Sequence, residues 1–175
     1  MGIVQFKIQI DGQVELNKAF KGIIESVANY KQIFQNLVPE FHKMENSIFR
    51  NEGDVSPNKR WKDLSVNYYR EKKEMFDAGI YRSMDILTAT GRLRDSLTMQ
   101  TNDSIINIKE DEMEIGTSVF YGIDHQKGKR RLAKRKFIFV SNGFRKAIAI
   151  IFKKEMQKKI DLQLAQDKKT WRTSI

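Results

Sequence analysis

Residues 105–119 read Ile-Ile-Asn-Ile-Lys-Glu-Asp-Glu-Met-Glu-Ile-Gly-Thr-Ser-Val, and this stretch decides the class of fold. Two apolar segments, 105–108 and 113–119, flank the polar pair Asp111-Glu112, which is the pattern of an antiparallel β-hairpin. Residues 3–10 alternate apolar and polar side chains with the period of two that is typical of a half-buried strand. A small antiparallel sheet is therefore expected.

Segments with helical spacing lie on both sides of this hairpin. Apolar residues recur there at three- and four-residue steps, as in amphipathic helices, over residues 14–38, 40–51, 65–78, 90–97 and 142–160. Residues 137–140, Phe-Ile-Phe-Val, are expected to form a further strand. Because strands and helices do not alternate regularly, we expect an α+β fold in which a small antiparallel sheet packs against several helices, including a long C-terminal helix.

Local signals set the expected helix ends. Pro39 has no backbone N–H to donate, so it is expected to break or kink the first long helix. Ser65, Thr90 and Asn142 each precede an apolar run and are expected N-caps, because their side chains can accept from the free N–H groups of a helix start. Residues 53–60 are polar and turn-rich, which predicts an exposed loop.

The length of 175 residues fits a single domain spanning 1–175. Within it we expect a basic loop or hairpin tip around 127–136 and a frayed C-terminal tail from about residue 166. No cysteine is present and there are two histidines, which argues against thiolate or histidine-rich metal centres. No apolar run approaches the roughly 20 residues of a membrane span, so we expect no membrane partner.

The positive charge is concentrated in the C-terminal third. Residues 1–126 carry 16 Lys and Arg against 19 Asp and Glu, a net charge of −3, whereas residues 127–175 carry 16 against 3, a net charge of +13. Such a field favours an anionic partner, either nucleic acid or an acidic protein surface. The densest part has seven cations in ten residues: Lys127, Lys129, Arg130, Arg131, Lys134, Arg135 and Lys136.

Two interpretations of this basic stretch stay open. It either binds phosphates or forms a mobile hairpin tip that charge keeps soluble. No aromatic residue is interleaved with the cations, so any contact with nucleic acid is expected to follow the backbone and to be independent of base sequence.

No motif for catalysis stands out. The chain has no Gly-x-Ser-x-Gly, His-Glu-x-x-His or Gly-x-Gly-x-x-Gly pattern, and we expect no enzymatic activity and no cofactor. A magnesium-dependent nuclease would have to draw on scattered carboxylates, with His125 as a general base. Charged residues in turns are usually solvated, so we expect no metal site there. The carboxylates in question are Asp103, Asp111, Glu112, Glu114 and Asp124.

Four blocks of the sequence nevertheless form a recognisable series. They are Trp61-Lys62-Asp63-Leu64-Ser65, then Thr90-Gly91-Arg92-Leu93-Arg94-Asp95-Ser96, then Ile115-Gly116-Thr117, then Tyr121-Gly122-Ile123-Asp124-His125-Gln126-Lys127-Gly128. In this order and spacing they resemble the phage virion morphogenesis family, whose members are tail-completion or neck proteins of Mu-like and related tailed phages. The likeness covers about residues 49–155.

The sequence departs from the family pattern in three places. Asp63 stands where proline is usual, and Gly122 stands where alanine is usual. Residues 135–139 read Arg-Lys-Phe-Ile-Phe in place of Arg-Pro-Phe-Leu-Gly, so we expect the turn that enters the last predicted strand to differ from that of the family.

The resemblance implies a non-enzymatic virion component that joins or completes the head–tail junction, is assembled in the host cytoplasm, and binds neighbouring neck and tail proteins. A homo-oligomeric ring is expected, and its basic surface would face either packaged DNA or an acidic neighbour. The residues that the family pattern implies are structural are Trp61, Leu64, Thr90, Gly91, Leu93, Gly116, Tyr121, His125, Gln126 and Gly128. Contact candidates are Arg60, Trp61 and the seven cations of 127–136. The alternative is a sequence-independent nucleic-acid-binding protein.

Overall fold

The computed structural model describes residues 4–9, 29–54 and 60–173. Strands β1 (Val4–Gln9), β2 (Ser104–Ile108) and β3 (Glu112–Thr117) form one sheet in the order β1-β3-β2, with both pairs antiparallel. Met113 and Ile115 of β3 are buried, which is consistent with a sheet that has one face on the core. The predicted first strand, the hairpin and the α+β class are confirmed.

Helix α3 (Lys31–Arg50) corrects one prediction, because it continues through Pro39. Its buried side chains, which include Phe34, Leu37, Phe41 and Phe49, lie on both sides of the proline along one continuous face. Pro39 itself is exposed, so the carbonyl that loses its helical partner lies where water can solvate it. Residues 14–28 of the predicted first helix lie outside the described part of the chain.

Two shorter helices follow. Helix α4 (Val66–Asp77) begins at the predicted N-cap Ser65, whose Oγ accepts from the Tyr68 N–H at 3.4 Å, and ends at Ala78 as expected. Helix α5 (Arg92–Thr98) begins one residue later than predicted, because its N-cap is Gly91 with φ +83° rather than Thr90. A side chain is disfavoured at that φ, which explains why glycine stands there.

The C-terminal part contains further corrections. Helix α6 (Gly122–Lys127) forms in the fourth motif block, where we predicted no helix, and residues 137–140 form no strand. Helix α7 (Asn142–Thr173) is capped by Ser141 rather than Asn142, since the Ser141 Oγ accepts from the Phe144 N–H at 3.1 Å. Its backbone is helical to Thr173.

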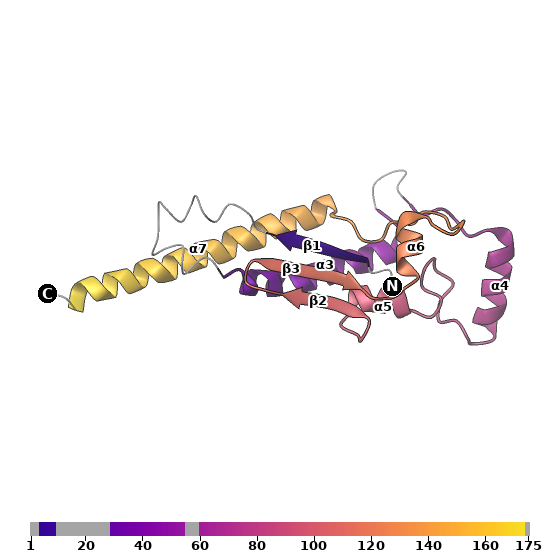
Figure 1. Cartoon of the computed structure of the whole chain (residues 1–175), viewed down its shortest axis with the longest axis horizontal. Helices are drawn as coiled ribbons and strands as arrows, with labels where there is room; N and C mark the ends of the chain where they lie inside the picture. Colours follow the sequence, from indigo (N-terminus) through magenta and orange to yellow (C-terminus); the bar gives the residue numbers. More distant parts are fainter. Residues whose placement is uncertain (1–3, 10–28, 55–59, 174–175) are drawn as a thin grey trace.

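The described elements form an elongated body with two projecting helices (Figure 1). Helix α3 packs against α7 and α5, and the sheet lies against the same core. Helix α4 lies at one end of the long axis and has at most weak contacts with the other described helices and strands, while α7 extends from the opposite end. None of the described helices is long and apolar enough to cross a membrane. The molecule therefore presents α4 as an arm beyond its packed core.

Candidate functional site

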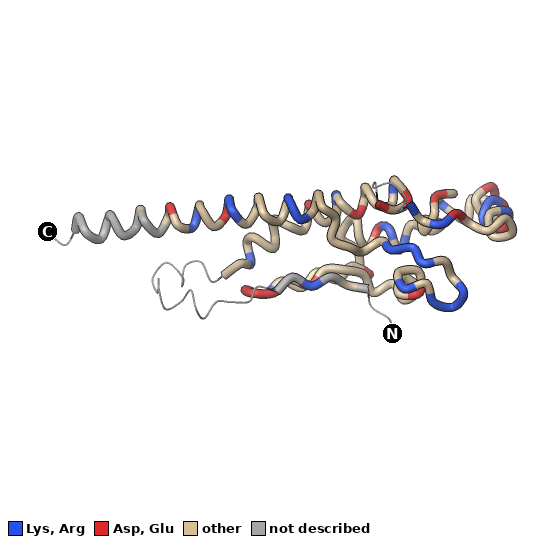
Figure 2. The backbone as a smooth tube through the Cα atoms, turned by 90° about the horizontal axis from the view of Figure 1, so that it is seen from above, with Lys and Arg blue, Asp and Glu red and all other residues tan. Residues whose placement is uncertain are grey.

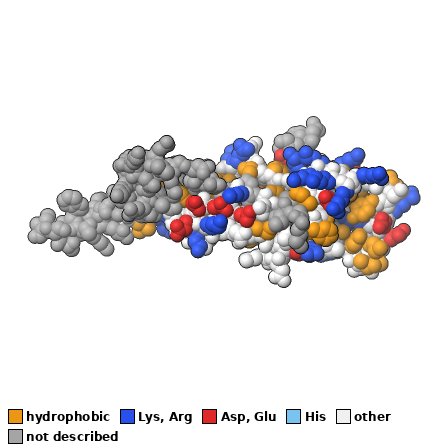
Figure 3. Space-filling view, in the orientation of Figure 1, with side chains coloured by type: hydrophobic (Ala, Val, Ile, Leu, Met, Phe, Trp, Pro, Cys, Tyr) orange, Lys and Arg blue, Asp and Glu red, His pale blue; other side chains and the backbone are white. Residues whose placement is uncertain are grey.

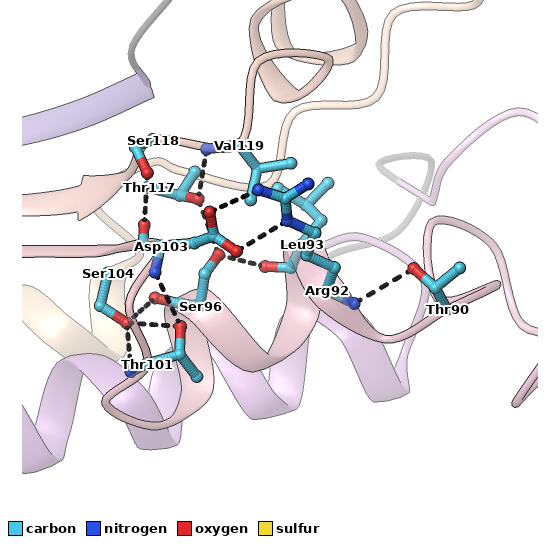
Figure 4. A network of polar contacts seen from close by, with 10 residues as sticks. All are labelled: Thr90, Arg92, Leu93, Ser96, Thr101, Asp103, Ser104, Thr117, Ser118 and Val119. Atoms are coloured by element: carbon cyan, nitrogen blue, oxygen red, sulfur yellow. Dashed lines mark hydrogen bonds and ion pairs between the residues drawn. The ribbon is translucent and has the colours of Figure 1, made fainter.

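The helix motif 90–97 and the strand motif 115–117 meet in a buried polar contact (Figure 4). The hydroxyls of Ser96 and Thr117 lie 2.7 Å apart, and both side chains are buried. Ser96 also bonds to the Leu93 carbonyl, and Thr117 Oγ1 accepts from the Val119 N–H at 3.1 Å. Because buried hydroxyls need partners, this contact fixes α5 on the end of β3.

An ion pair reinforces the same junction at the surface (Figure 4). The Arg92 guanidinium donates to both oxygens of Asp103 at 2.7 Å, and these hydrogen bonds hold the pKa of that carboxyl below its ordinary value. The Asp103 carbonyl accepts from the Ser118 N–H at 2.9 Å. Asp103 thus joins α5 to the strand ends.

Gln126 explains why residues 137–140 do not join the sheet. Its Oε1 accepts from the N–H groups of Phe137 and Ile138 at 2.9 and 3.2 Å, and its Nε2 donates to the Ile138 carbonyl at 2.7 Å. These backbone groups therefore have partners without a neighbouring strand. Phe137 and Ile138 are buried, but they lie in an irregular segment that the Gln126 side chain holds and not in the predicted strand.

Two contact candidates are corrected by their burial. Trp61 is 6% exposed, packs edge-on against Phe49 and donates from Nε1 to the Lys136 carbonyl at 2.7 Å. Arg135 is also 6% exposed, and its guanidinium donates to the carbonyls of Lys62 and Asp63. Neither side chain is available to a partner. Together they tie the loop after residue 60 to the end of the basic stretch.

The other seven contact candidates are exposed: Arg60, Lys127, Lys129, Arg130, Arg131, Lys134 and Lys136. Figure 2 shows the basic stretch as a protruding loop beside the core, not a β-hairpin tip. Arg60 pairs with Glu52 and Arg130 with Asp124, each at 3.4 Å. The two arginine side chains are largely exposed, although Asp124 is buried, so solvent screens these pairs and the cations can exchange partners.

Gly128 shapes the start of this loop. It closes α6 with φ +69°, and a Cβ placed there would lie 2.9 Å from the Cβ of Lys134. A side chain at this position would therefore strain the backbone and displace the returning chain. The glycine of the motif keeps the two ends of the loop close together.

Between α4 and this loop lies a groove of about 1120 Å³. Its lining includes family-motif residues Leu64, Thr90, Tyr121 and His125. The His125 Nδ1 is buried without a hydrogen-bond partner among the described residues, and burial, aided by the nearby Arg135, lowers the pKa of the imidazole. His125 is therefore neutral at physiological pH. A neutral, buried imidazole fits a structural role better than a role as a charged contact with a partner.

Of the remaining motif residues, Leu93 is fully buried in the core and Gly116 lies in β3 opposite Gln5 and Ile105. The sequence did not identify Tyr68, Lys72, Tyr81 and Leu132 as groove residues. One signal was present: Leu132 and Ala133 interrupt an otherwise cationic stretch. Tyr68 and Lys72 come from α4, whose two faces cannot be ranked by periodicity alone, and Tyr81 lies in the irregular segment after that helix.

Three of the five carboxylates considered for magnesium binding form ion pairs. Asp103 pairs with Arg92, Asp124 with Arg130, and Glu112 with Lys7 at 2.8 Å. Within the described ranges, no group of three His, Cys, Asp or Glu side chains is arranged to hold a metal ion. The geometry gives a metal-dependent nuclease no support.

The comparisons with known proteins agree with the motif pattern. The family model described as phage virion morphogenesis family matches residues 11–166. No curated protein and no solved structure matches the chain. The matched range contains all four motif blocks, whose residues the structure joins through Ser96–Thr117, Gln126 and Trp61. The chain belongs to the phage virion morphogenesis family.

Proposed function

We propose that this protein acts at the head–tail junction or in tail completion, where it binds neighbouring neck and tail proteins as a homo-oligomer. Membership of the family makes it a structural component of phage virion assembly that meets other phage structural proteins. The proposal goes further by placing it at the neck and by assigning its contacts to particular surfaces. On this proposal the chain is assembled in the host cytoplasm and acts by packing and charge complementarity.

The observation that carries the proposal is the division between motif residues and exposed residues. The motif side chains are occupied within the fold: Ser96 bonds to Thr117, Gln126 holds residues 137–138, and Trp61 holds Lys136. The exposed cations of the loop and the projecting α4 remain free for neighbours. This division, with motif side chains used inside the fold and other side chains exposed, favours a role in assembly over a role in catalysis.

The experiment is to interrupt the reading frame in its parent phage or prophage and image the induced lysate by electron microscopy. We expect DNA-filled heads beside unattached or malformed tails, and restoration of intact particles when the chain is supplied in trans. Normal, infectious particles from the interrupted phage would contradict the proposal. Supplying Ile150→Asp, an exposed position on α7 away from the loop, is the matched control.

A second candidate function is sequence-independent binding of nucleic acid, favoured by the exposed cations of residues 127–136. The logarithm of the DNA affinity falls linearly with the logarithm of the salt concentration, and each phosphate contact makes this slope steeper by about 0.9. Reversing Arg130, Arg131 and Lys134 to Glu is then expected to abolish DNA binding and flatten this slope. Reversing Lys153 and Lys154 on α7 is the control. Unchanged affinity in the loop variant would rule this function out. Arg135 is left intact because it holds the fold.

A further inference from the structure

The groove between α4 and the basic loop combines an apolar lining with a cationic wall. Leu64, Ile86, Leu87 and Leu132 supply apolar surface, and Tyr68 and Tyr121 add aromatic rings. A volume of about 1120 Å³ is larger than most small-molecule pockets and fits several side chains of another polypeptide. The lining therefore fits an occupant that has apolar side chains of its own.

The charges around the groove define the occupant further. Lys62, Arg131 and Lys134 line it with their side chains exposed, and no carboxylate in the described part of the chain forms an ion pair with them. Lys72 and Arg135 also line it, but they are buried and donate to backbone carbonyls, so they are not available to an occupant. Asp63 is the one acid among the lining residues. The occupant should thus carry acidic side chains beside its apolar ones.

Backbone strain is concentrated at the same place. Leu87 and Arg131, both in the lining, have φ values of +63° and +64°, and the adjacent Arg130 has +54°. Non-glycine residues rarely adopt this conformation, and such strain is found preferentially where a surface is shaped for binding. The strained backbone is thus a second feature, separate from the charges, that indicates that the groove is a contact surface.

A segment of matching chemistry is present on the chain itself, at the free end of α4. Residues 74–80 read Glu-Met-Phe-Asp-Ala-Gly-Ile, with two acids and no cation. Asp77 pairs with Lys73 at 2.6 Å within the arm, and because this pair is exposed its carboxylate can exchange partners. Phe76 and Ile80 are 41% and 63% exposed although both are large and apolar. Figure 3 shows apolar side chains at this end of the molecule, beside acidic ones. We call residues 74–80 the arm tip.

We propose that the arm tip of one copy docks in the groove of a second copy, with Phe76 and Ile80 on the apolar lining and Glu74 and Asp77 facing Arg131 and Lys134. This inference rests on the homo-oligomer of the proposed function and names its interface. Because arm tip and groove are different surfaces, the contact is head-to-tail. Its repetition closes a ring when the rotation between copies permits.

The chemistry of the groove favours this occupant over nucleic acid. A phosphate backbone would use the cations but would leave Leu64, Leu87 and Leu132 against a charged, hydrated strand. The arm tip satisfies the apolar lining and the cationic wall together. It also buries Phe76 and Ile80, which are 41% and 63% exposed in the described structure.

The test is sedimentation of the purified full-length chain and two variants that each disable one side of the contact. The arm variant is Phe76→Asp with Ile80→Asp, and the groove variant is Leu132→Asp with Lys134→Glu. All four positions are exposed, so both variants should fold, which circular dichroism checks. The matched control is Ile150→Asp, an apolar residue on α7 that is 65% exposed.

We expect the wild-type chain and the Ile150→Asp control to self-associate, more weakly as salt rises, and each double variant alone to sediment as the 20.5 kDa monomer. Mixing the two variants should give a dimer and nothing larger. The arm tip of the groove variant is intact and can dock in the intact groove of the arm variant. The arm tip of the arm variant and the groove of the groove variant are both disabled, so no third copy can add.

Three results would overturn the proposal. They are a wild-type chain that stays monomeric at its highest attainable concentration, variants that still self-associate, and a mixture that stays monomeric. A groove variant that loses DNA binding while self-association is unchanged would assign the groove to nucleic acid instead. The imaging of interrupted phage is independent of these measurements, so a virion role would stand even if this interface failed.

Discussion

Glu45 lies fully buried on α3, and neither of its carboxylate oxygens has a hydrogen-bond partner among the described residues. Burial raises the pKa of this carboxyl well above its ordinary value of 4.5, so the folded protein keeps this proton to a higher pH than the unfolded chain does. The unfolded chain releases that proton above its own, lower pKa. Stability therefore falls as the pH rises through the window between the two pKa values.

This predicts that Glu45→Gln, which cannot ionise, gains stability relative to the wild-type chain as the pH rises above about 4.5. Urea denaturation of both proteins at a series of pH values measures the difference. Glu114→Gln, on β3 and only half-buried, is the control and should show no such trend. A wild-type advantage that grows with pH would mean that Glu45 is ionised and paired in the fold.

Gln126 is the second residue whose role can be measured. Gln126→Ala removes the acceptor for Phe137 and Ile138 and the donor to the Ile138 carbonyl, and it leaves part-buried groups without partners. We expect a loss of about 1–3 kcal/mol in the free energy of unfolding. Gln126→Glu keeps the acceptor, so it should cost less. Equal stability of all three proteins would show that residues 137–138 are held in another way.

At the scale of elements, local patterns predicted the strands and the start of α4 correctly. Alternation identified β1 and the β2–β3 hairpin, and Ser65 marked its helix. The failures came from contacts that are distant in sequence. Residues 137–140 have the composition of a strand, but the side chain of Gln126 takes the hydrogen bonds a neighbouring strand would supply. No local pattern can show that competition.

Pro39 failed as a helix stop for a related reason. The apolar face of α3 packs on both sides of it, so tertiary packing outweighs the local cost of the missing hydrogen bond. We predict that Pro39→Ala stabilises the protein by about 2 kcal/mol, because alanine restores the bond at an exposed helix position. Thermal unfolding measures the gain, and a lower melting temperature would show that the proline supports the fold.

At the scale of the whole molecule, the division of charge could be predicted from the sequence, but the arm and groove could not. The basic loop was identified from its composition, whereas the burial of Trp61 and Arg135 was not. Their burial depends on how the loop after residue 60 meets the end of the basic stretch. Contact candidates chosen by residue type therefore included two residues that hold the fold together.

The anchoring of the loop leads to a prediction at this scale. Arg135→Glu should unfold or strongly destabilise the protein, because it places an acid against the carbonyls of Lys62 and Asp63 at a buried site. Lys134→Glu, its exposed neighbour, should leave the melting temperature within a few degrees of the wild-type value. Similar melting temperatures for the two variants would contradict the assignment of Arg135 as an anchor.

The chain belongs to a virion morphogenesis family, and we propose that it lies at the head–tail junction of the particle. The most direct measurement is electron microscopy of purified particles labelled with gold-coupled antibodies raised against the chain. We predict gold at the junction between head and tail in intact particles, and none on particles from the interrupted phage. Intact, infectious particles without label, or label confined to the head shell or the distal end of the tail, would contradict the claim.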